Sequence, residues 1–409
     1  MNPLWRSLRG FNYRLWAAGA LLSNIGTWMQ LTTQDWLVLT RLTAHSAHAL
    51  GLVMALQFGP QVLLLPLTGY AADHCRRRRL LCLTQSAMGL LALALGLLTL
   101  AGRVNLAEVE GFALLLGCMT AFDTPARQTM VALLVGEADL SNAVALNAAS
   151  FSAARMIGPA LAGLLTASVG AGWVFLLNAA SYGAVIVALL RLRVQDLHGG
   201  GGRRAAPGKL SEGFVYLWRR ADLRAIMLML FLIGTFGLNF PIFIATMSVS
   251  VFHADARQYG LLFSSMALGS IGGALLSARR ARADFSQLCV GSLLFALACA
   301  AAAIMPDYAG FALALLLAGA AIQTVTTSCN SLVQLSTEPG MRGRVIAILM
   351  AITLGGTPLG ALLVGWVADH CGARWALAIA AVAGLVAGVI ALRHLRARPL
   401  PGAAPTTAR

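Results

Sequence analysis

Apolar and polar stretches alternate along the chain in a pattern that predicts twelve membrane spans. A helix of about 20 residues is needed to cross ~30 Å of hydrocarbon, and apolar segments of that length recur. We place the spans at residues 14–40, 48–73, 80–100, 110–131, 140–167, 171–191, 223–250, 257–278, 285–305, 308–333, 344–368 and 375–392. The first segment is too long for a signal-peptide core and is followed closely by a second span, so we expect it to be a membrane helix.

Basic residues are sorted between the gaps that separate these spans. Of the 30 Lys and Arg residues, Arg155 lies inside a span, and four lie in odd-numbered gaps, at Arg41, Arg103, Arg257 and Arg374. The other 25 lie near the chain ends or in and beside the even-numbered gaps. Because Lys and Arg are retained on the cytoplasmic side, we expect a multi-pass protein of the inner (plasma) membrane with both termini in the cytoplasm.

Composition excludes several other classes. Only 11% of the residues are charged and 58% are hydrophobic, whereas soluble chains carry about 25% charged residues. The net charge of +15 follows from the sorting of arginines toward an anionic membrane surface, so we expect membrane lipids and no nucleic acid as partners. The seven cysteines lack metal or disulfide spacing, and the repeated tetrad Ala-Asp-His-Cys at 72–75 and 368–371 falls on opposite faces. We therefore expect no metal site.

One long polar stretch divides the spans into two sets of six. We assign residues 1–192 and 222–398 to six-helix bundles, 193–221 to a cytoplasmic linker and 399–409 to a cytoplasmic tail. After Ser211 the linker groups apolar side chains on one face, which predicts an amphipathic helix on the membrane surface. Short segments echo one another at an offset of about 200 residues, as parallel transporter repeats do. The predicted fold is an all-α membrane protein of twelve helices in two bundles.

The loop between spans 2 and 3 resembles the signature of the major facilitator superfamily. That signature reads Gly-x-x-x-Asp-Arg-x-Gly-Arg-Arg, and this chain has Gly69, Asp73, Arg77 and Arg78 at matching positions. The segments 122–128, 155–159 and 355–360 are similar to the proton-linked exporter branch that contains macrolide-efflux and enterobactin-type siderophore exporters. The resemblance covers essentially the whole chain and implies the same twelve-helix fold.

The resemblance also implies roles for individual residues. An acid near the inner end of span 4 pairs with the signature arginines in the superfamily, so we assign Gly69, Asp73, Arg77, Arg78 and Asp123 to an inner gate. A static ion pair that only fixes topology is the alternative. Gly158, Pro159 and Gly163 resemble the span-5 motif of antiporters, and with Pro358 they are assigned to helix packing.

Charged and polar side chains inside spans mark a candidate cavity. A charge in the bilayer costs about 2.5–3.5 kcal/mol on insertion scales and usually faces a cavity or a partner. Asp35 is the candidate proton carrier, with a water-exposed acid at the outer mouth as the alternative. Arg155 is the candidate for holding an anionic group, or else a structural donor to backbone carbonyls. Further candidates follow helical spacing in spans 1, 4, 7 and 10: Asn24, Arg127, Asn239, Gln323, Thr327, Asn330 and Gln334.

These features predict a secondary active transporter. We expect export of a small amphipathic organic solute, a drug or a siderophore, by alternating access with the proton as coupling ion, no other cofactor and a monomeric protein. Lysophospholipid movement is an alternative in the same class, and a non-transporting receptor or assembly protein is one in a different class. The chain has no His-Glu-x-x-His, Gly-x-Ser-x-Gly or nucleotide-binding loop, so no enzyme is expected.

Overall fold

The computed structural model describes residues 3–198, 210–278, 284–338 and 340–397, and every regular element in those ranges is a helix. The N-terminal half contains η1 (Pro3–Arg9), α1 (Phe11–Leu37), η2 (Val38–Leu42), α2 (Ala47–Leu63), α3 (Leu65–His74), α4 (Arg77–Leu100), α5 (Leu106–Leu134), α6 (Glu137–Ser168) and α7 (Ala171–Arg191). The connection contains η3 (Val194–Asp196) and α8 (Leu210–Arg219). The C-terminal half contains α9 (Ala221–Leu232), η4 (Ile233–Gly237), α10 (Phe240–Thr246), η5 (Met247–Val251), α11 (Ala256–Ala278), α12 (Phe285–Ile304), α13 (Tyr308–Ser336), α14 (Arg342–Cys371) and α15 (Ala373–Ala397).

Each predicted span coincides with a helix or with a run of consecutive helices. Nine helical runs in the described residues are long and apolar enough to cross a membrane by length and composition. The other three are α1, α2 and α5. The 17-residue α2 is continued by α3 after a break at Leu64. The helices α1 and α5 are 27 and 29 residues long, which is enough to cross a membrane. Their polar and charged residues, and not their length, keep them out of the set of nine.

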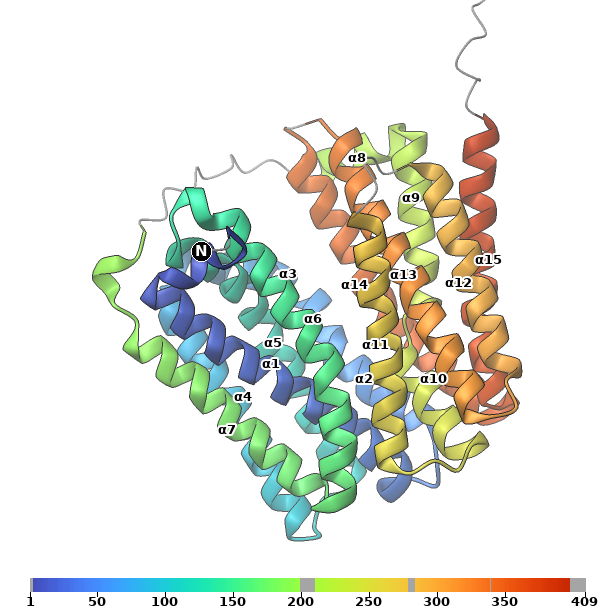
Figure 1. The fold of residues 1–409 in the computed structure, drawn as a ribbon, viewed down its shortest axis with the longest axis horizontal. Coiled ribbons are helices and arrows are strands. Elements are labelled where there is room, and N and C mark those ends of the chain that lie inside the picture. The colour runs from blue at the N-terminus through green and yellow to red at the C-terminus, as the bar shows by residue number, and fades with distance from the viewer. Residues whose placement is uncertain (1–2, 199–209, 279–283, 339, 398–409) are drawn as a thin grey trace, which may run out of the picture.

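The two halves repeat one pattern of helix packing. In the N-terminal half α4 packs on α5 and α7, and α2 packs on α5. In the C-terminal half α12 packs on α13 and α15, and α11 packs on α13. The second set is the first shifted by six spans, as expected for parallel repeats. The halves meet mainly through α2 against α14 and α6 against α11 (Figure 1).

Glycines allow the backbones of the two halves to touch. A Cβ on Gly51 would overlap the carbonyl oxygen of Ala361, and one on Gly163 would overlap that of Ala256. Gly260 meets the carbonyl of Pro159 in the same way. Within the N-terminal half, Gly158 packs α6 against α1 at Trp28. Small residues at such crossings are how membrane helices pack closely without a hydrophobic driving force.

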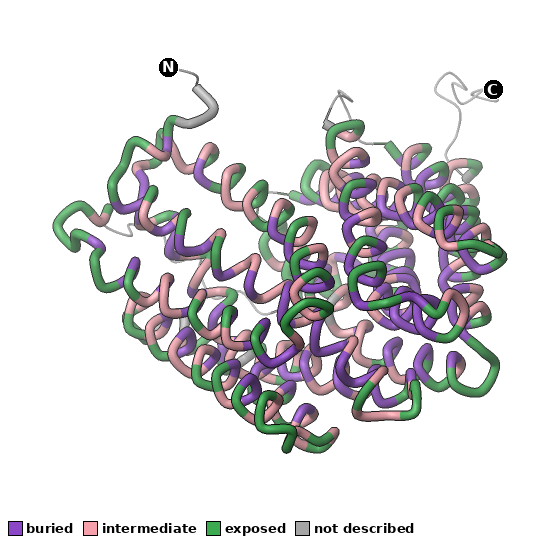
Figure 2. The backbone as a smooth tube through the Cα atoms, turned by 60° about the horizontal axis from the view of Figure 1, so that its bottom comes forward, coloured by how far each residue is buried: buried purple, intermediate pink, exposed green. Residues whose placement is uncertain are grey.

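The contacts between the halves are concentrated toward one end of the bundle. The first described helix, η1, lies at the same end of the molecule as α8 and the last turns of α15, and we call this end the basic end (Figure 1). The residues that join the halves lie nearer the opposite end, at the start of α2 and α11 and the end of α6 and α14. From there the halves diverge toward the basic end (Figure 1). Figure 2 shows that buried positions gather in the C-terminal half and where the halves meet, with exposed positions on the outer surfaces.

Span 7 is interrupted, unlike its prediction as one regular helix. Its residues 233–237 and 247–251 are π-helical, and the chain turns between them at Leu238 and Asn239 before α10 begins with Pro241 in its first turn. Proline is accepted there because the first N–H groups of a helix have no intrahelical partner. The run Ala221–Val251 is also the most buried of the nine apolar runs: 67% of the residues in its most apolar 18-residue segment are buried. Helical spacing of 3.6 residues therefore does not hold along this span.

Candidate transport cavity and buried ion pair

A cavity of about 280 Å³ lies between the halves. One wall comes from α1, α2 and α6 and the other from α10, α11, α14 and the turn before α10. The lining side chains are mostly apolar or aromatic: Trp28, Leu31, Thr32, Asp35, Met54, Gln57, Phe58, Gln61, Arg155, Leu238, Phe240, Pro241, Phe263, Met266, Ala267, Ser270 and Thr357. An apolar cavity with a few convergent polar groups is the usual form of a small-molecule site.

The cavity brings together Asp35 and Arg155, two charges that are far apart in the sequence. Asp35 comes from α1 and is only 7% exposed, which does not fit a water-exposed acid at an outer mouth. Arg155 comes from α6. Among the described residues, neither side chain has a hydrogen-bond or ion-pair partner within the protein. Both charges are therefore available to a bound solute or, for the acid, to a proton.

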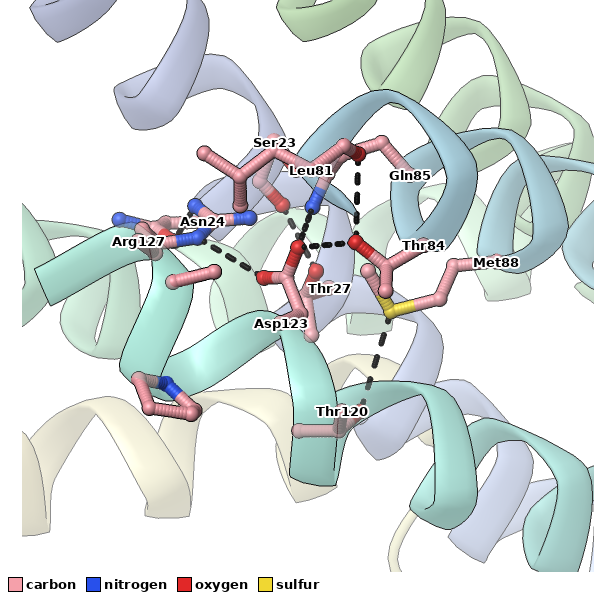
Figure 3. A network of polar contacts seen from close by, with 12 residues as sticks. Ser23, Asn24, Thr27, Leu81, Thr84, Gln85, Met88, Thr120, Asp123 and Arg127 are labelled. Carbon is pink, nitrogen blue, oxygen red and sulfur yellow. Dashed lines mark hydrogen bonds and ion pairs between the residues drawn. The ribbon is translucent and has the colours of Figure 1, made fainter. Parts of the chain in front are cut away.

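A second polar cluster lies deep in the N-terminal half (Figure 3). Asp123 accepts hydrogen bonds on Oδ1 from Thr84 Oγ1 at 2.8 Å and Gln85 Nε2 at 2.7 Å, and its Oδ2 forms an ion pair with Arg127 Nε at 3.0 Å. Arg127 also donates to Asn24 Oδ1 at 3.2 Å. The acid is 4% exposed. Its position is explained by the i,i+4 spacing to Arg127 on α5 and by the face of α4 that carries Thr84 and Gln85.

The predicted partnership of Asp123 with the signature arginines is not present in this arrangement. In the described residues no ion pair joins Asp123 to Arg77 or Arg78. Arg78 instead donates to the carbonyl of Leu190 at the end of α7, at 3.0 Å, where a cation suits the negative end of a helix. Gly69 and Asp73 belong to α3, but the burial and contacts of both residues lie outside what the structure describes. The gate is assigned to the state in which the basic end is closed, so its formation stays a prediction.

The polar stripes of spans 7 and 10 do not line the cavity, contrary to expectation. Asn239 is fully buried and donates to the carbonyl of Thr235, beside Gly360 of α14. The Asn239 side chain does not face the cavity because the π-helical interruption of span 7 changes the direction in which it points. On α13, Gln323 donates to Thr327, a bond within one helix. Asn330 and Gln334 follow on the same helix, and neither they nor Gln323 and Thr327 are among the lining residues.

Several residues that surround these groups were not identified from the sequence. Gln57 and Gln61 line the cavity, and Thr84 and Gln85 hold Asp123. The pair Gln57 and Gln61 has helical i,i+4 spacing, which was the available signal. Gly158, Pro159 and Gly163 lie at helix crossings. Pro358 lies in α14 between Gly356 and Gly360, which pack against Thr235.

Comparison with known proteins identifies the family. The family model described as transmembrane secretion effector, a major facilitator family, matches residues 4–404. The chain belongs to this family. The expected family is thereby confirmed. The chain is a major facilitator transporter, a multi-pass membrane protein and not an enzyme.

Individual relatives of this transporter are distant in sequence. The staphyloferrin A transporter of Staphylococcus aureus is 27% identical over 87% of this chain and 89% of its own. The multidrug efflux pump Tap of Mycolicibacterium fortuitum is 25% identical over 93% of this chain and 95% of its own. A bacterial homologue of the human lysosomal transporter Spinster has the same fold, with a TM-score of 0.77 at 15% identity over 98% of this chain and 100% of its own.

Proposed function

We propose that this transporter exports an amphipathic organic solute with an acidic group in exchange for protons. The observation that supports the proposal is the presence of Asp35 and Arg155, without protein partners, in a cavity that is otherwise largely apolar and aromatic. The apolar lining suits the hydrophobic part of such a solute. Arg155 is placed to pair with its acidic group, and Asp35 is placed to hold a proton when the solute is absent.

Sidedness follows from the distribution of charge. Because basic residues gather at the end that carries the termini, this end belongs in the cytoplasm of the inner membrane. The divergence of the halves toward that end then corresponds to a state open to the cytoplasm. Relatives named as a siderophore transporter and a multidrug efflux pump agree with export of a small organic solute.

The test is transport by the purified protein in liposomes with an imposed pH gradient. Three probes separate the classes: carboxyfluorescein as an anionic aromatic solute, ethidium as a cationic one, and a fluorescent lysophosphatidylcholine. We expect carboxyfluorescein transport that rises with the gradient and falls when a protonophore is added. Arg155→Gln should lower its apparent affinity by about 10- to 100-fold, since a hydrogen bond to a charged group contributes ~1.5–3 kcal/mol.

Asp35→Asn distinguishes coupling from binding. This variant should lose the response to the gradient while still exchanging solute down its concentration gradient. Asp139→Asn is the matched control, because Asp139 forms a surface ion pair with Arg6 away from the cavity. Wild-type transport that ignores the gradient would refute proton coupling, and transport of the lysophospholipid alone would favour the lipid alternative.

A further inference from the structure

The end of α14 caps a helix of the other half at the end opposite the termini. The carboxylate of Asp369 accepts from Ser46 Oγ at 2.9 Å, from the backbone N–H of Ala47 at 2.5 Å and from that of His48 at 2.9 Å. Ser46 is the N-cap of α2, and its hydroxyl accepts from the N–H of Ala49 at 3.2 Å. One acid of the C-terminal half therefore satisfies two backbone donors and one hydroxyl of the N-terminal half.

These donors need an outside partner. The first N–H groups of an α-helix have no acceptor within the helix, and a carboxylate at this position is favoured by the positive end of the helix dipole. When the halves separate at this end, Ala47 and His48 lose both the charge and its oxygens. The three hydrogen bonds of Asp369 can therefore form only while the two halves are in contact at the end opposite the termini.

The acid lies at the end of a line of direct backbone contacts. Gly51 meets the carbonyl of Ala361, and Gly365 meets the backbone of Ala47 and His48. Such contacts bring α14 and α2 together but carry little directionality. Three hydrogen bonds to one carboxylate add a fixed register.

Other helix-capping acids in the C-terminal half act within their own half. Asp307 accepts from the N–H of Gly310 at the start of α13 at 2.8 Å, and Asp284 accepts from that of Phe285 at the start of α12 at 2.7 Å. Asp369 does not cap its own helix. This difference indicates a role in joining the halves.

We propose that Asp369 is the latch of a gate at the end opposite the termini. Its bonds to Ser46, Ala47 and His48 hold the cavity closed on that side, and their release accompanies opening there. The latch sets the balance between the two access states of the transporter. It acts through the position of α2 and does not touch the solute.

Distances between spin labels test this proposal in the full-length protein in lipid nanodiscs. One label pair at Arg103 and Ile304 reports on the opposite end, and a second pair at Asp196 and Glu338 reports on the basic end. The seven native cysteines are first replaced, and the resulting protein must still transport. In Asp369→Ala we expect the ratio of states to shift by about tenfold toward longer distances for the first pair and shorter ones for the second.

The matched control is Asp307→Ala, which removes a helix-capping acid at the same end but within one half. It should leave both distance distributions unchanged. Ser46→Ala removes one of the three donors and should give a smaller shift in the same direction, with little further effect when combined with Asp369→Ala. If Asp369→Ala does not fold, Ser46→Ala alone still tests the proposal. Unchanged distances in Asp369→Ala and Ser46→Ala, or an equal change in Asp307→Ala, would overturn the latch.

The measurement needs neither a transported solute nor a pH gradient. A failure of the proposed substrate or of proton coupling would therefore leave this result interpretable. Conversely, a failed latch would leave the proposed export function standing.

Discussion

Buried charge in the N-terminal half occurs in two settings with different partners. Asp123 has three donors around it, including Arg127, whereas Asp35 has none among the described residues and lines the cavity. The donors around Asp123 tie α4 to α5. In the described part of the chain, Asp35 forms no such tie and faces the cavity. The first acid thus serves to hold helices together, and the second is the one suited to transport chemistry.

Removing the charge of Asp123 should destabilise the protein. In Asp123→Asn the Arg127 side chain, 17% exposed, is left without its counter-ion. Breaking a buried pair by removing one partner costs ~3–5 kcal/mol, so we expect about 3 kcal/mol in the free energy of unfolding and a lower melting temperature in detergent. The double variant with Arg127→Gln should recover part of this loss. If Asp123→Asn has the melting temperature of the wild-type protein, the ion pair does not stabilise the fold, and the gate is the remaining role for Asp123.

The sequence was sufficient to find the charges of the site but not their partners. Asp35, Asp123, Arg127 and Arg155 stand out because charge is costly in hydrocarbon. The partners of Asp123 lie about 40 positions away on α4, and no local pattern links them to it. Asp369 was visible as part of a repeated tetrad, which was considered only as a metal site and was rejected as one because its two copies fall on opposite faces. No pattern in the sequence shows that α14 crosses α2 at this residue.

At the scale of the element, the alternation of apolar and polar stretches placed each predicted span on a helix or a run of helices, and it missed their internal irregularities. The break at Leu64 and the π-helical parts of span 7 leave the apolar content unchanged, so no hydropathy window detects them. These irregularities determine which side chains of a span face the cavity and which face a neighbouring helix. They are why Asn239 is buried against Gly360 and not exposed to the cavity.

The packing of span 7 on α14 should be intolerant of a single methyl group. A Cβ at Gly360 would overlap the carbonyl oxygen of Thr235 and approach Asn239 Nδ2 at 2.9 Å. Overpacking of this kind costs ~1–3 kcal/mol, so Gly360→Ala should lower thermal stability in detergent. Gly183→Ala on α7 is the control, because nothing lies within 4 Å of its Cβ position. Equal melting of the two variants would show that the crossing relaxes freely.

At the scale of the whole molecule, the two halves and their order were predictable from one polar linker and the sorting of arginines. The divergence of the halves was not, because it depends on how the two halves pack against each other. The apolar pattern of a span does not specify that packing. The sequence therefore predicts the two six-helix halves more clearly than it predicts how they are placed relative to each other.

Topology can be tested on intact cells with a membrane-impermeant maleimide. In a cysteine-free background, Asp307→Cys should be labelled from outside and Asp196→Cys only after the membrane is permeabilised. The expectation rests on 25 basic residues on one side against four on the other, a bias that fixes orientation. Labelling of Asp196→Cys in sealed cells would reverse the assignment of the basic end.

The presence of one acid and one base in the same cavity has an electrical consequence. If a proton enters while a monovalent anionic solute leaves, two elementary charges move inward in each cycle. Each is worth about 2.3 kcal/mol at 100 mV, so a potential of that size, negative inside, contributes ~4.6 kcal/mol. That is more than a thousandfold concentration ratio, at 1.4 kcal/mol for each tenfold step. Voltage, more than acidity outside, would then determine how far this transporter can empty the cell.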